Sequence, residues 1–220
     1  MQDGASVLDV GCGIGGTTRY LAANKACNVT GITISGQQVR IARDLTAKEA
    51  GSSGQVINDG STPLKLNNGV VQFIELDAEK MGDFFTEEQN EKTFDAVWIS
   101  EAMSHLPDKK LFFKNAKLLL NPGGKLVVAD WFKADGMIDE ELNADIRPIE
   151  GELALMTTMY TLTGSDGMLL PPLCTQSEYV QYAKDAGLKI YTGPLDISKE
   201  VSKTWYVISQ SRPDFFHGLP

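Results

Sequence analysis

Short apolar stretches alternate along the chain with segments in which apolar residues recur at helical spacing. The strand-like stretches cover residues 5–10, about 28–34, 70–77, 93–100 and 125–131. Helical spacing follows at residues 17–23, at Val39, Ile41, Ala42 and Leu45, and at residues 108–120. This alternation predicts a parallel sheet whose strands are joined by crossover helices.

Two regions interrupt the alternation. Residues 51–69 are polar, rich in turn-forming residues and without clear periodicity, which predicts a surface excursion. Residues 132–174 carry apolar residues at helical spacing, which predicts two helices inserted beside the sheet. After this insertion, residues 176–186 are expected to form a helix and residues 188–191 a sixth strand.

The composition is that of an ordinary soluble domain, with 42% hydrophobic and 22% charged residues in 220. The net charge of −9 argues against nonspecific binding to nucleic acid and against adhesion to anionic membranes. No apolar stretch approaches the length of a membrane span, and the N-terminus lacks a signal region, so we expect a cytoplasmic protein.

Cysteine and histidine residues are too few to form a disulfide framework or a metal centre. Cys12, Cys27 and Cys174 are odd in number and far apart, and His105 and His217 are the only histidines. We therefore expect buried, reduced thiols, no disulfides and no metal site.

The most informative segment is Asp9-Val10-Gly11-Cys12-Gly13-Ile14-Gly15-Gly16, between the first strand and the first helix. Glycine lets the backbone turn tightly and approach a ligand, and a helix N-terminus offers unpaired N–H groups, so such a turn suits a nucleoside-bearing ligand. The segment also matches G-x-G-x-x-G, the dinucleotide-binding fingerprint. An NAD(P)-dependent oxidoreductase is disfavoured, however, because Asp9 stands where an apolar residue is usual and no acid ends residues 28–35.

Residues 7–16 resemble motif I of the class I S-adenosylmethionine-dependent methyltransferases. The resemblance implies an α/β fold with a doubly wound, mostly parallel, Rossmann-like sheet, helices on both faces and a helical insertion after the fifth strand. It implies S-adenosyl-L-methionine as the cofactor. In the family this turn holds the methionine portion, which assigns cofactor binding to Asp9, Gly11, Cys12 and Gly13, with the acid directed toward the ammonium group.

Two further segments resemble cofactor-contacting parts of the family. Most class I enzymes have an acid after the second strand, whereas residues 31–38 are similar to the G-[IL]-T-[IL]-S-x-x-Q segment of tocopherol, sterol and cyclopropane-fatty-acid methyltransferases. That likeness implies cofactor contacts from Thr33 and Gln38; an ordinary strand end is the alternative. After the third strand, Asp77 is implied as an acceptor for the adenine amino group, with Ala78 alongside. Capping of a helix by Asp77 is the alternative, and the two roles are compatible.

Residues 100–108 resemble the E-x-x-x-H-x-x-D segment of the tocopherol methyltransferase-like and ubiquinone-biosynthesis-like groups. Ser100 is expected to line the cofactor cleft, and Glu101 and His105 to face the methyl acceptor. Histidine titrates near neutrality, so His105 is a candidate general base for an O–H or N–H nucleophile. Orientation of a loop is the alternative role for His105.

The leading hypothesis is an S-adenosylmethionine-dependent methyltransferase that acts on carbon, oxygen or nitrogen of a small, lipophilic metabolite. The alternative is a catalytically impaired S-adenosylmethionine-binding protein of the same fold. Apolar side chains of the insertion would line the acceptor pocket or belong to the core; they are Met156, Met159, Tyr160 and Met168.

We expect residues 1–220 to form a single domain in which residues 132–174 act as a lid. Relatives continue with an N-terminal helical cap and a last strand, which this chain is expected to lack. Self-association through the exposed lid surface is therefore expected.

Overall fold

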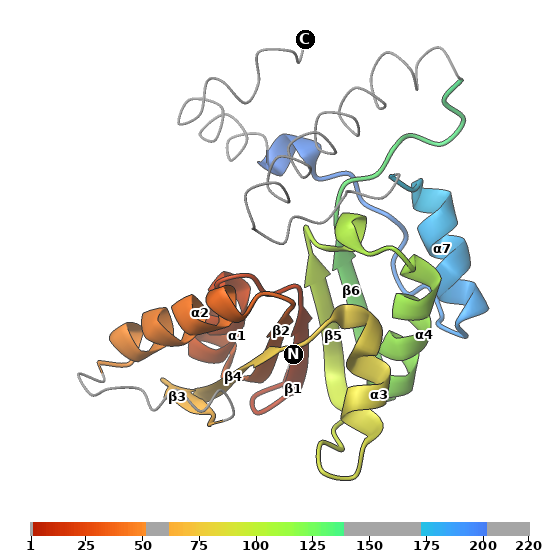
Figure 1. Ribbon diagram of the computed structural model, residues 1–220. Helices are drawn as coiled ribbons and strands as arrows, with labels where there is room; N and C mark the ends of the chain where they lie inside the picture. Colours follow the sequence, from red (N-terminus) through yellow and green to blue (C-terminus); the bar gives the residue numbers. More distant parts are fainter. Residues whose placement is uncertain (1, 52–61, 139–172, 202–220) are drawn as a thin grey trace, which may run out of the picture. The chain divides into compact units, whose positions relative to one another are not determined.

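The computed structural model describes residues 2–51, 62–138 and 173–201. The chain divides into two compact units, residues 1–189 and residues 190–220. In the described residues, the first unit contains a six-stranded sheet with the strand order β3-β4-β2-β1-β5-β6 (Figure 1). The strands are β1 (Ser6–Val10), β2 (Asn28–Thr33), β3 (Leu64–Leu66), β4 (Gly69–Glu75), β5 (Phe94–Ser100) and β6 (Leu120–Ala129).

All strand pairs are parallel except β3 with β4, which is antiparallel. The chain moves from the central strand β1 outward to β2 and β4, and then returns to β5 and β6 on the other side of β1. The point at which the strand order reverses lies between β1 and β5, where ligands bind in open α/β sheets. The expected doubly wound, mostly parallel sheet is confirmed.

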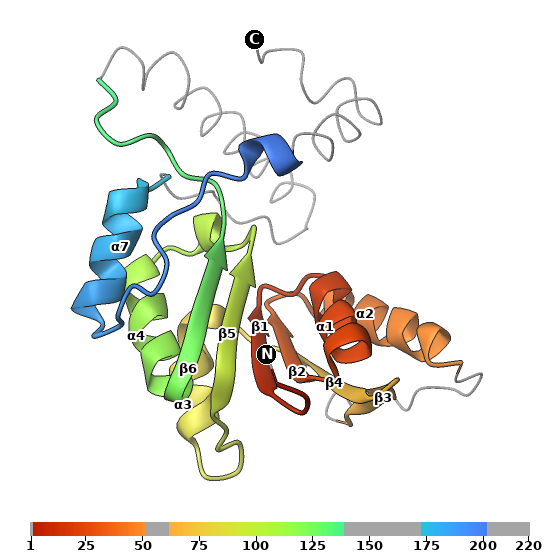
Figure 2. The same ribbon diagram turned by 180° about the vertical axis from the view of Figure 1, so that it is seen from behind.

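Helices cover both faces of the sheet, as Figures 1 and 2 show from opposite sides. The helices α1 (Gly16–Lys25) and α2 (Gly36–Glu49) lie on one face. The other face carries α3 (Met81–Thr86), α4 (Lys109–Leu119) and α7 (Gln176–Asp185). Two short 3-10 helices, η1 (Ala78–Lys80) and η2 (Met103–His105), follow β4 and β5.

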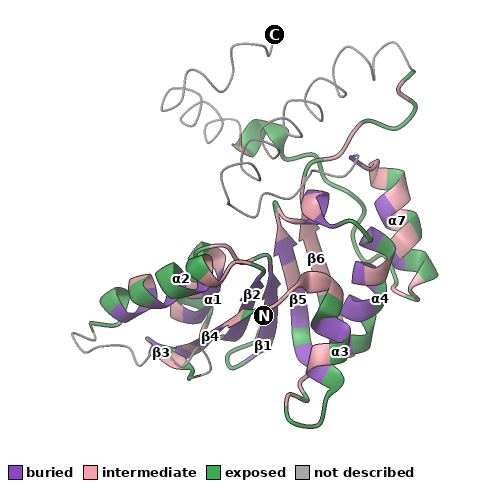
Figure 3. Ribbon diagram, in the orientation of Figure 1, coloured by how far each residue is buried: buried purple, intermediate pink, exposed green. Residues whose placement is uncertain are grey.

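Alternation of side chains along the strands produces two cores, one on each face. Leu8 and Val10 of β1 belong to the cluster that includes Phe112 of α4, whereas Val7 belongs to the cluster that includes Leu21 of α1. Buried residues are concentrated in β1 and β2, while β6 is only half-buried over most of its length (Figure 3). The middle of the sheet is thus the rigid part on which a site can be built.

The segment predicted as a surface excursion contains a strand that the sequence pattern did not reveal. Residues Leu64–Leu66 form β3, which pairs with Gly69–Val71 through a tight turn at Asn67, with φ 52°. Three residues are too few to display a periodicity, so the strand depends on its hairpin partner. The predicted apolar face of α2 is only partly confirmed. Val39 and Ala42 are buried, but Ile41 is 38% exposed.

The end of the first unit differs from prediction as well. Residues 188–191 form no strand; the Leu188 N–H instead donates to the Ala183 carbonyl and closes the end of α7. Ile190 and Tyr191 are exposed. The lid expected at residues 132–174 lies mostly outside the described residues, as do Met156, Met159, Tyr160 and Met168.

Candidate functional site

The parallel register brings the ends of the central strands to one edge of the sheet. Val10 pairs with Ile32 and with Ile99, and Thr33 pairs with Glu75. The candidate cofactor residues therefore lie at strand ends on the same edge of the sheet. Thr33 and Ser100 are the last residues of β2 and β5, and the glycine turn and Asp77 come after β1 and β4. Sequence analysis placed the candidate cofactor residues at strand ends, and the structure gathers them there.

The glycine turn has a backbone that only glycine adopts without strain. Gly11, Gly13 and Gly15 have φ values of 70°, 54° and 79°. The Cys12 N–H donates to the Ile32 carbonyl at 3.0 Å, which ties the turn to β2. A Cβ added at Gly13 would have no heavy atom within 4 Å, so the turn borders open space where a ligand would approach it.

Asp9 lies beneath this turn and is buried to 3% exposure. The Thr18 hydroxyl of α1 donates to its carboxylate at 2.6 Å. Burial raises the pKa of Asp9 to about 6, against the opposing effect of the Thr18 hydrogen bonds. A cationic group bound nearby would favour the ionised carboxylate, so this position fits a ligand that carries an ammonium group.

Cys12 contributes to the shape of the turn rather than to reactivity. Burial raises the pKa of its thiol, and the nearby Asp9 carboxylate raises it further. The thiol is therefore neutral and poorly nucleophilic. Its sulfur packs so tightly against β2 that a Cβ added at Gly31 would lie 2.9 Å from it. Cys27 is buried, whereas Cys12 and Cys174 are half-buried rather than fully buried as expected.

Thr33 and Gln38, assigned together from the resemblance, are hydrogen-bonded to each other. The Thr33 hydroxyl donates to the Gln38 side-chain oxygen at 2.6 Å. Ser35 caps α2 by accepting from the Gln38 N–H at 3.3 Å, which holds Gln38 in the first turn of the helix. The pair is thus pre-arranged at the end of β2, while its contact with the cofactor stays a prediction.

Asp77 caps η1, as the structural alternative proposed. Its carboxylate accepts from the Glu79 N–H at 3.0 Å, and Ala78 begins the 3-10 helix beside it. The Leu76 N–H donates to the Thr33 carbonyl at 2.9 Å, so Asp77 follows directly from the end of the β2–β4 pairing. This cap leaves the predicted adenine contact compatible with the structure.

The segment after β5 packs against the glycine turn. Gly11 and Ala102 touch so closely that a Cβ on Gly11 would overlap the Ala102 side chain. Glu101 is exposed and has a left-handed φ of 53°, a strained backbone for a residue other than glycine. His105 ends η2 and is half-buried. The candidate acceptor residues therefore stand next to the candidate cofactor turn.

Sequence reasoning assigned no role to two polar residues that shape this site, although it placed Asp130 at a strand end near the acceptor side. Thr18 binds Asp9, and Asp130 binds the backbone of η2 through the N–H groups of Met103 and Ser104. Thr18 lies nine positions after Asp9, in the first turn of α1, so the strand–turn–helix order of the sequence could have indicated this contact. The contact of Asp130 spans 27 positions and leaves no local signal.

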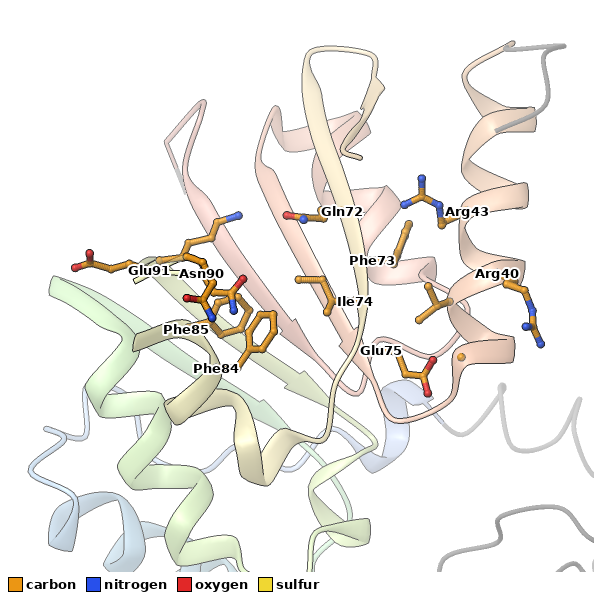
Figure 4. A pocket seen from close by; sticks show the side chains of 14 residues that line it. Arg40, Arg43, Gln72, Phe73, Ile74, Glu75, Phe84, Phe85, Asn90 and Glu91 are labelled. Carbon is orange, nitrogen blue, oxygen red and sulfur yellow. The ribbon is translucent and has the colours of Figure 1, made fainter. Parts of the chain in front are cut away.

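A separate cavity of about 740 Å³ is lined by residues of α2, β4 and the α3–β5 connection (Figure 4). None of the candidate cofactor or acceptor residues lines it. It is lined by polar and aromatic side chains that include Arg43, Gln72, Phe84, Phe85 and Lys92. The Lys92 amino group donates to the Thr30 hydroxyl at 2.8 Å, and burial lowers its pKa.

Neither a metal cluster nor a membrane span is found in the part of the chain that the structure describes. Within these residues no group of three or more histidine, cysteine or acidic side chains is arranged to hold a metal ion. None of the described helices combines the length and the apolar character needed to cross a bilayer.

Residues 8–128, more than half of the chain, match the family described as methyltransferase domain. The chain belongs to this family, and its likeness to class I S-adenosylmethionine-dependent methyltransferases is confirmed. The family membership also decides against the NAD(P)-dependent oxidoreductase.

Named relatives include a phytyl hydroquinone methyltransferase and a cycloartenol methyltransferase. The chain is 41% identical over 135 residues to 2-methyl-6-phytyl-1,4-hydroquinone methyltransferase of Synechocystis sp., covering 61% of this chain and 35% of that protein. It is 30% identical over 207 residues to cycloartenol-C-24-methyltransferase 1 of Oryza sativa, covering 94% of this chain and 50% of the relative. The chain thus spans half or less of the length of these relatives.

Solved structures of low sequence identity share the fold. A mycolic acid cyclopropane synthase complexed with S-adenosylhomocysteine has a TM-score of 0.62 at 19% identity, with 97% of this chain and 65% of that chain covered. A phosphoethanolamine N-methyltransferase of Haemonchus contortus, also bound to S-adenosylhomocysteine, has a TM-score of 0.62 at 19% identity, with coverage of 98% and 41%. Both support the Rossmann-like arrangement of the sheet.

Proposed function

We propose that the protein binds S-adenosylmethionine at the glycine turn and transfers its methyl group to a small, lipophilic metabolite. One observation carries the proposal: a buried carboxylate, Asp9, lies beneath an open left-handed glycine turn at the edge where the central strands end. The named relatives that act on a phytyl hydroquinone and on a sterol support the lipophilic class of acceptor. N-methyltransferases among the relatives leave carbon, oxygen and nitrogen as candidate methylation sites.

The residues at this edge fit the parts of such a cofactor. The Asp9 carboxylate suits the ammonium group, the open side of Gly13 leaves room for the methionine chain, and the Thr33–Gln38 pair offers polar groups at the end of β2. When bound, the cofactor supplies an electrophilic methyl group. The work left to the protein is to align the acceptor with that group and to exclude water.

On the acceptor side, we propose that His105 receives the proton released when an O–H or N–H nucleophile is methylated. His105 is half-buried at the end of η2, and Glu101 is exposed four residues earlier. For an acceptor methylated at carbon, the same pair would instead stabilise developing charge. Both roles need the segment 100–105 to keep its place against the glycine turn.

The test compares Gly13→Val with Gly123→Val. Both glycines have left-handed backbones, with φ of 54° and 83°, and neither has a heavy atom near an added Cβ. The strain is therefore matched, whereas only Gly13 borders the proposed site. Calorimetry with S-adenosylmethionine and S-adenosylhomocysteine should show binding to the parent and to Gly123→Val, and none to Gly13→Val.

Equal binding of S-adenosylmethionine by both variants would contradict the assignment of the cofactor site to the glycine turn. Tight binding of S-adenosylhomocysteine without turnover of any lipophilic quinol, sterol or amine acceptor would favour the catalytically impaired alternative.

A further inference from the structure

The carboxylate of Asp130 holds the backbone of η2 from the end of the neighbouring strand. Asp130 directly follows β6, and one of its oxygens accepts from the N–H groups of Met103 at 2.6 Å and Ser104 at 3.2 Å. Its other oxygen accepts from the Trp131 N–H at 2.7 Å. The side chain thus joins two segments, the residues after β5 and the residues after β6, at the edge that carries the candidate site.

Asp130 satisfies backbone N–H groups of η2 that the helix cannot pair by itself. The first N–H groups of a short helix have no partner within the helix, and a distant carboxylate satisfies two of them here. Glu101, just before, is kept in a left-handed conformation with its N–H bound to the Ala129 carbonyl at 2.8 Å. Because such a conformation persists only when its surroundings determine it, removal of the Asp130 contacts should release it.

The surroundings of Asp130 strengthen these hydrogen bonds. Lys109 is 6% exposed, and its amino group donates to the Leu106 carbonyl at 3.0 Å. Burial lowers the pKa of Lys109, while the charges of Cys174, Asp130 and Glu178 raise it. The Tyr179 hydroxyl, also near Asp130, is buried without a hydrogen-bond partner in the described part of the chain. Hydrogen bonds to an ionised carboxylate in partly buried surroundings are among the stronger ones.

We infer that Asp130 is a positioning residue: it fixes residues 101–105 against the glycine turn, so that Glu101 and His105 keep their place facing the acceptor. The effect on the methyl acceptor rests on the proposed function. The positioning role of Asp130 rests only on its own hydrogen bonds. Asp130 itself binds backbone N–H groups and need not touch the substrate.

Asp95 provides a matched control at the opposite edge of the sheet. It too is an aspartate that accepts from a distant backbone N–H, that of Ser6 at 2.9 Å, and it also accepts from the Asn121 side chain at 2.8 Å. Asp95→Asn therefore removes a comparable carboxylate far from the candidate site. Asp130→Asn keeps the size of the side chain, and Asp130→Glu keeps the charge.

Hydrogen exchange of the 220-residue protein tests the contact directly. Asp130→Asn should raise the exchange rates of the Met103 and Ser104 amides about ten-fold or more, since two charge-assisted hydrogen bonds are weakened. Asp95→Asn should leave those amides unchanged. Unchanged exchange in Asp130→Asn, or equal acceleration in both variants, would overturn the inference whether or not the protein methylates anything.

Two functional measurements separate positioning from plain stability. The NMR chemical shifts of the His105 ring should change in Asp130→Asn but not in Asp95→Asn. With 2-methyl-6-phytyl-1,4-hydroquinone as the probe acceptor, kcat should fall at least ten-fold in Asp130→Asn, with S-adenosylhomocysteine affinity nearly unchanged and partial rescue by Asp130→Glu. A parallel fall in both Asn variants would reduce Asp130 to a stabilising residue. Absence of turnover in the parent would count against the proposed function, while the imidazole and exchange data would still decide the role of Asp130.

Discussion

Asp9 shows at the scale of one residue how a ligand site differs from a folded core. For a carboxylate at 3% exposure, burial outweighs the hydrogen bonds from Thr18, and the pKa of Asp9 is accordingly raised from 3.8 to about 6. A shift of that size corresponds to roughly 3 kcal/mol. Because the folded state holds this proton more tightly than the unfolded state, the contribution of Asp9 to stability is full below pH 3.8 and is lost as the pH rises from there through 6.

Asp9→Asn should therefore stabilise the ligand-free protein at pH 7 by up to about 3 kcal/mol, since the amide oxygen still accepts from Thr18 and no charge is buried. The gain should disappear toward pH 4. Denaturant unfolding between pH 4 and pH 8 measures it. Asp95→Asn is the control of opposite sign, because hydrogen bonds from Asn121 and Ser6 lower the pKa of that exposed carboxyl.

The same substitution should weaken S-adenosylhomocysteine binding at pH 7 ten-fold or more, as expected for loss of a charge-assisted contact with the ammonium group. In the parent, affinity should fall as the pH drops through 6, and this dependence should be absent from Asp9→Asn. Calorimetry over that range decides the matter. A flat pH profile in the parent would separate Asp9 from the ligand and leave it a purely structural acid.

At the scale of elements, the sequence predicted those parts that an apolar run and its flanking residues determine locally. Helix α4 lies within the expected residues 108–120, with Asp108 accepting from the Leu111 N–H as its cap. The central parallel strands were found because strands buried on both faces are continuously apolar. Their carboxyl ends then had to meet at one edge, which is why the candidate site could be predicted before any contact was known.

Elements that depend on distant partners were missed or misplaced. Strand β3 exists through its hairpin with β4, and residues 188–191 fail to form a strand because their apolar pattern is not matched by a neighbour in the described residues. β6 begins at Leu120, before the predicted residue 125, because the register shift near Ala96 extends its pairing. The contact between Asp130 and Met103 likewise depends on the fold of two separate segments.

The junction between β2, α1 and the glycine turn can be tested as one unit. A methyl group at Gly31 would lie 2.9 Å from the Cys12 sulfur and 3.0 Å from both Phe73 and the Thr18 hydroxyl. Gly31→Ala should therefore lower the free energy of unfolding by about 1–3 kcal/mol and displace the turn. Gly16→Ala meets no atom and starts a helix with a better helix former, so its stability should be unchanged or slightly higher. Thermal unfolding of both variants measures the difference, and equal stability would show that the junction is looser than described.

For the whole molecule, the sheet has one weakly protected side. Among the described residues β6 is one of the two edge strands, with β3, and it is only half-buried over most of its length. Leu126 and Val128 pack against the core that includes α4, whereas Val127, on the opposite face, belongs to neither core among the described residues. A long edge strand with apolar side chains is a template for association with another chain.

We propose on this basis that the 220-residue protein self-associates through β6. Val127→Lys should shift it toward the monomer, because a lysine on an edge strand disfavours pairing with a second strand. Leu118→Lys is the control, since it adds the same charge to a side chain that is 58% exposed and belongs to α4 rather than to β6. Sedimentation velocity over a range of concentrations should show oligomers in the parent and in Leu118→Lys, and fewer in Val127→Lys. A parent that remains monomeric throughout would refute the proposal, and an equal reduction by both substitutions would point to net charge rather than to the β6 edge.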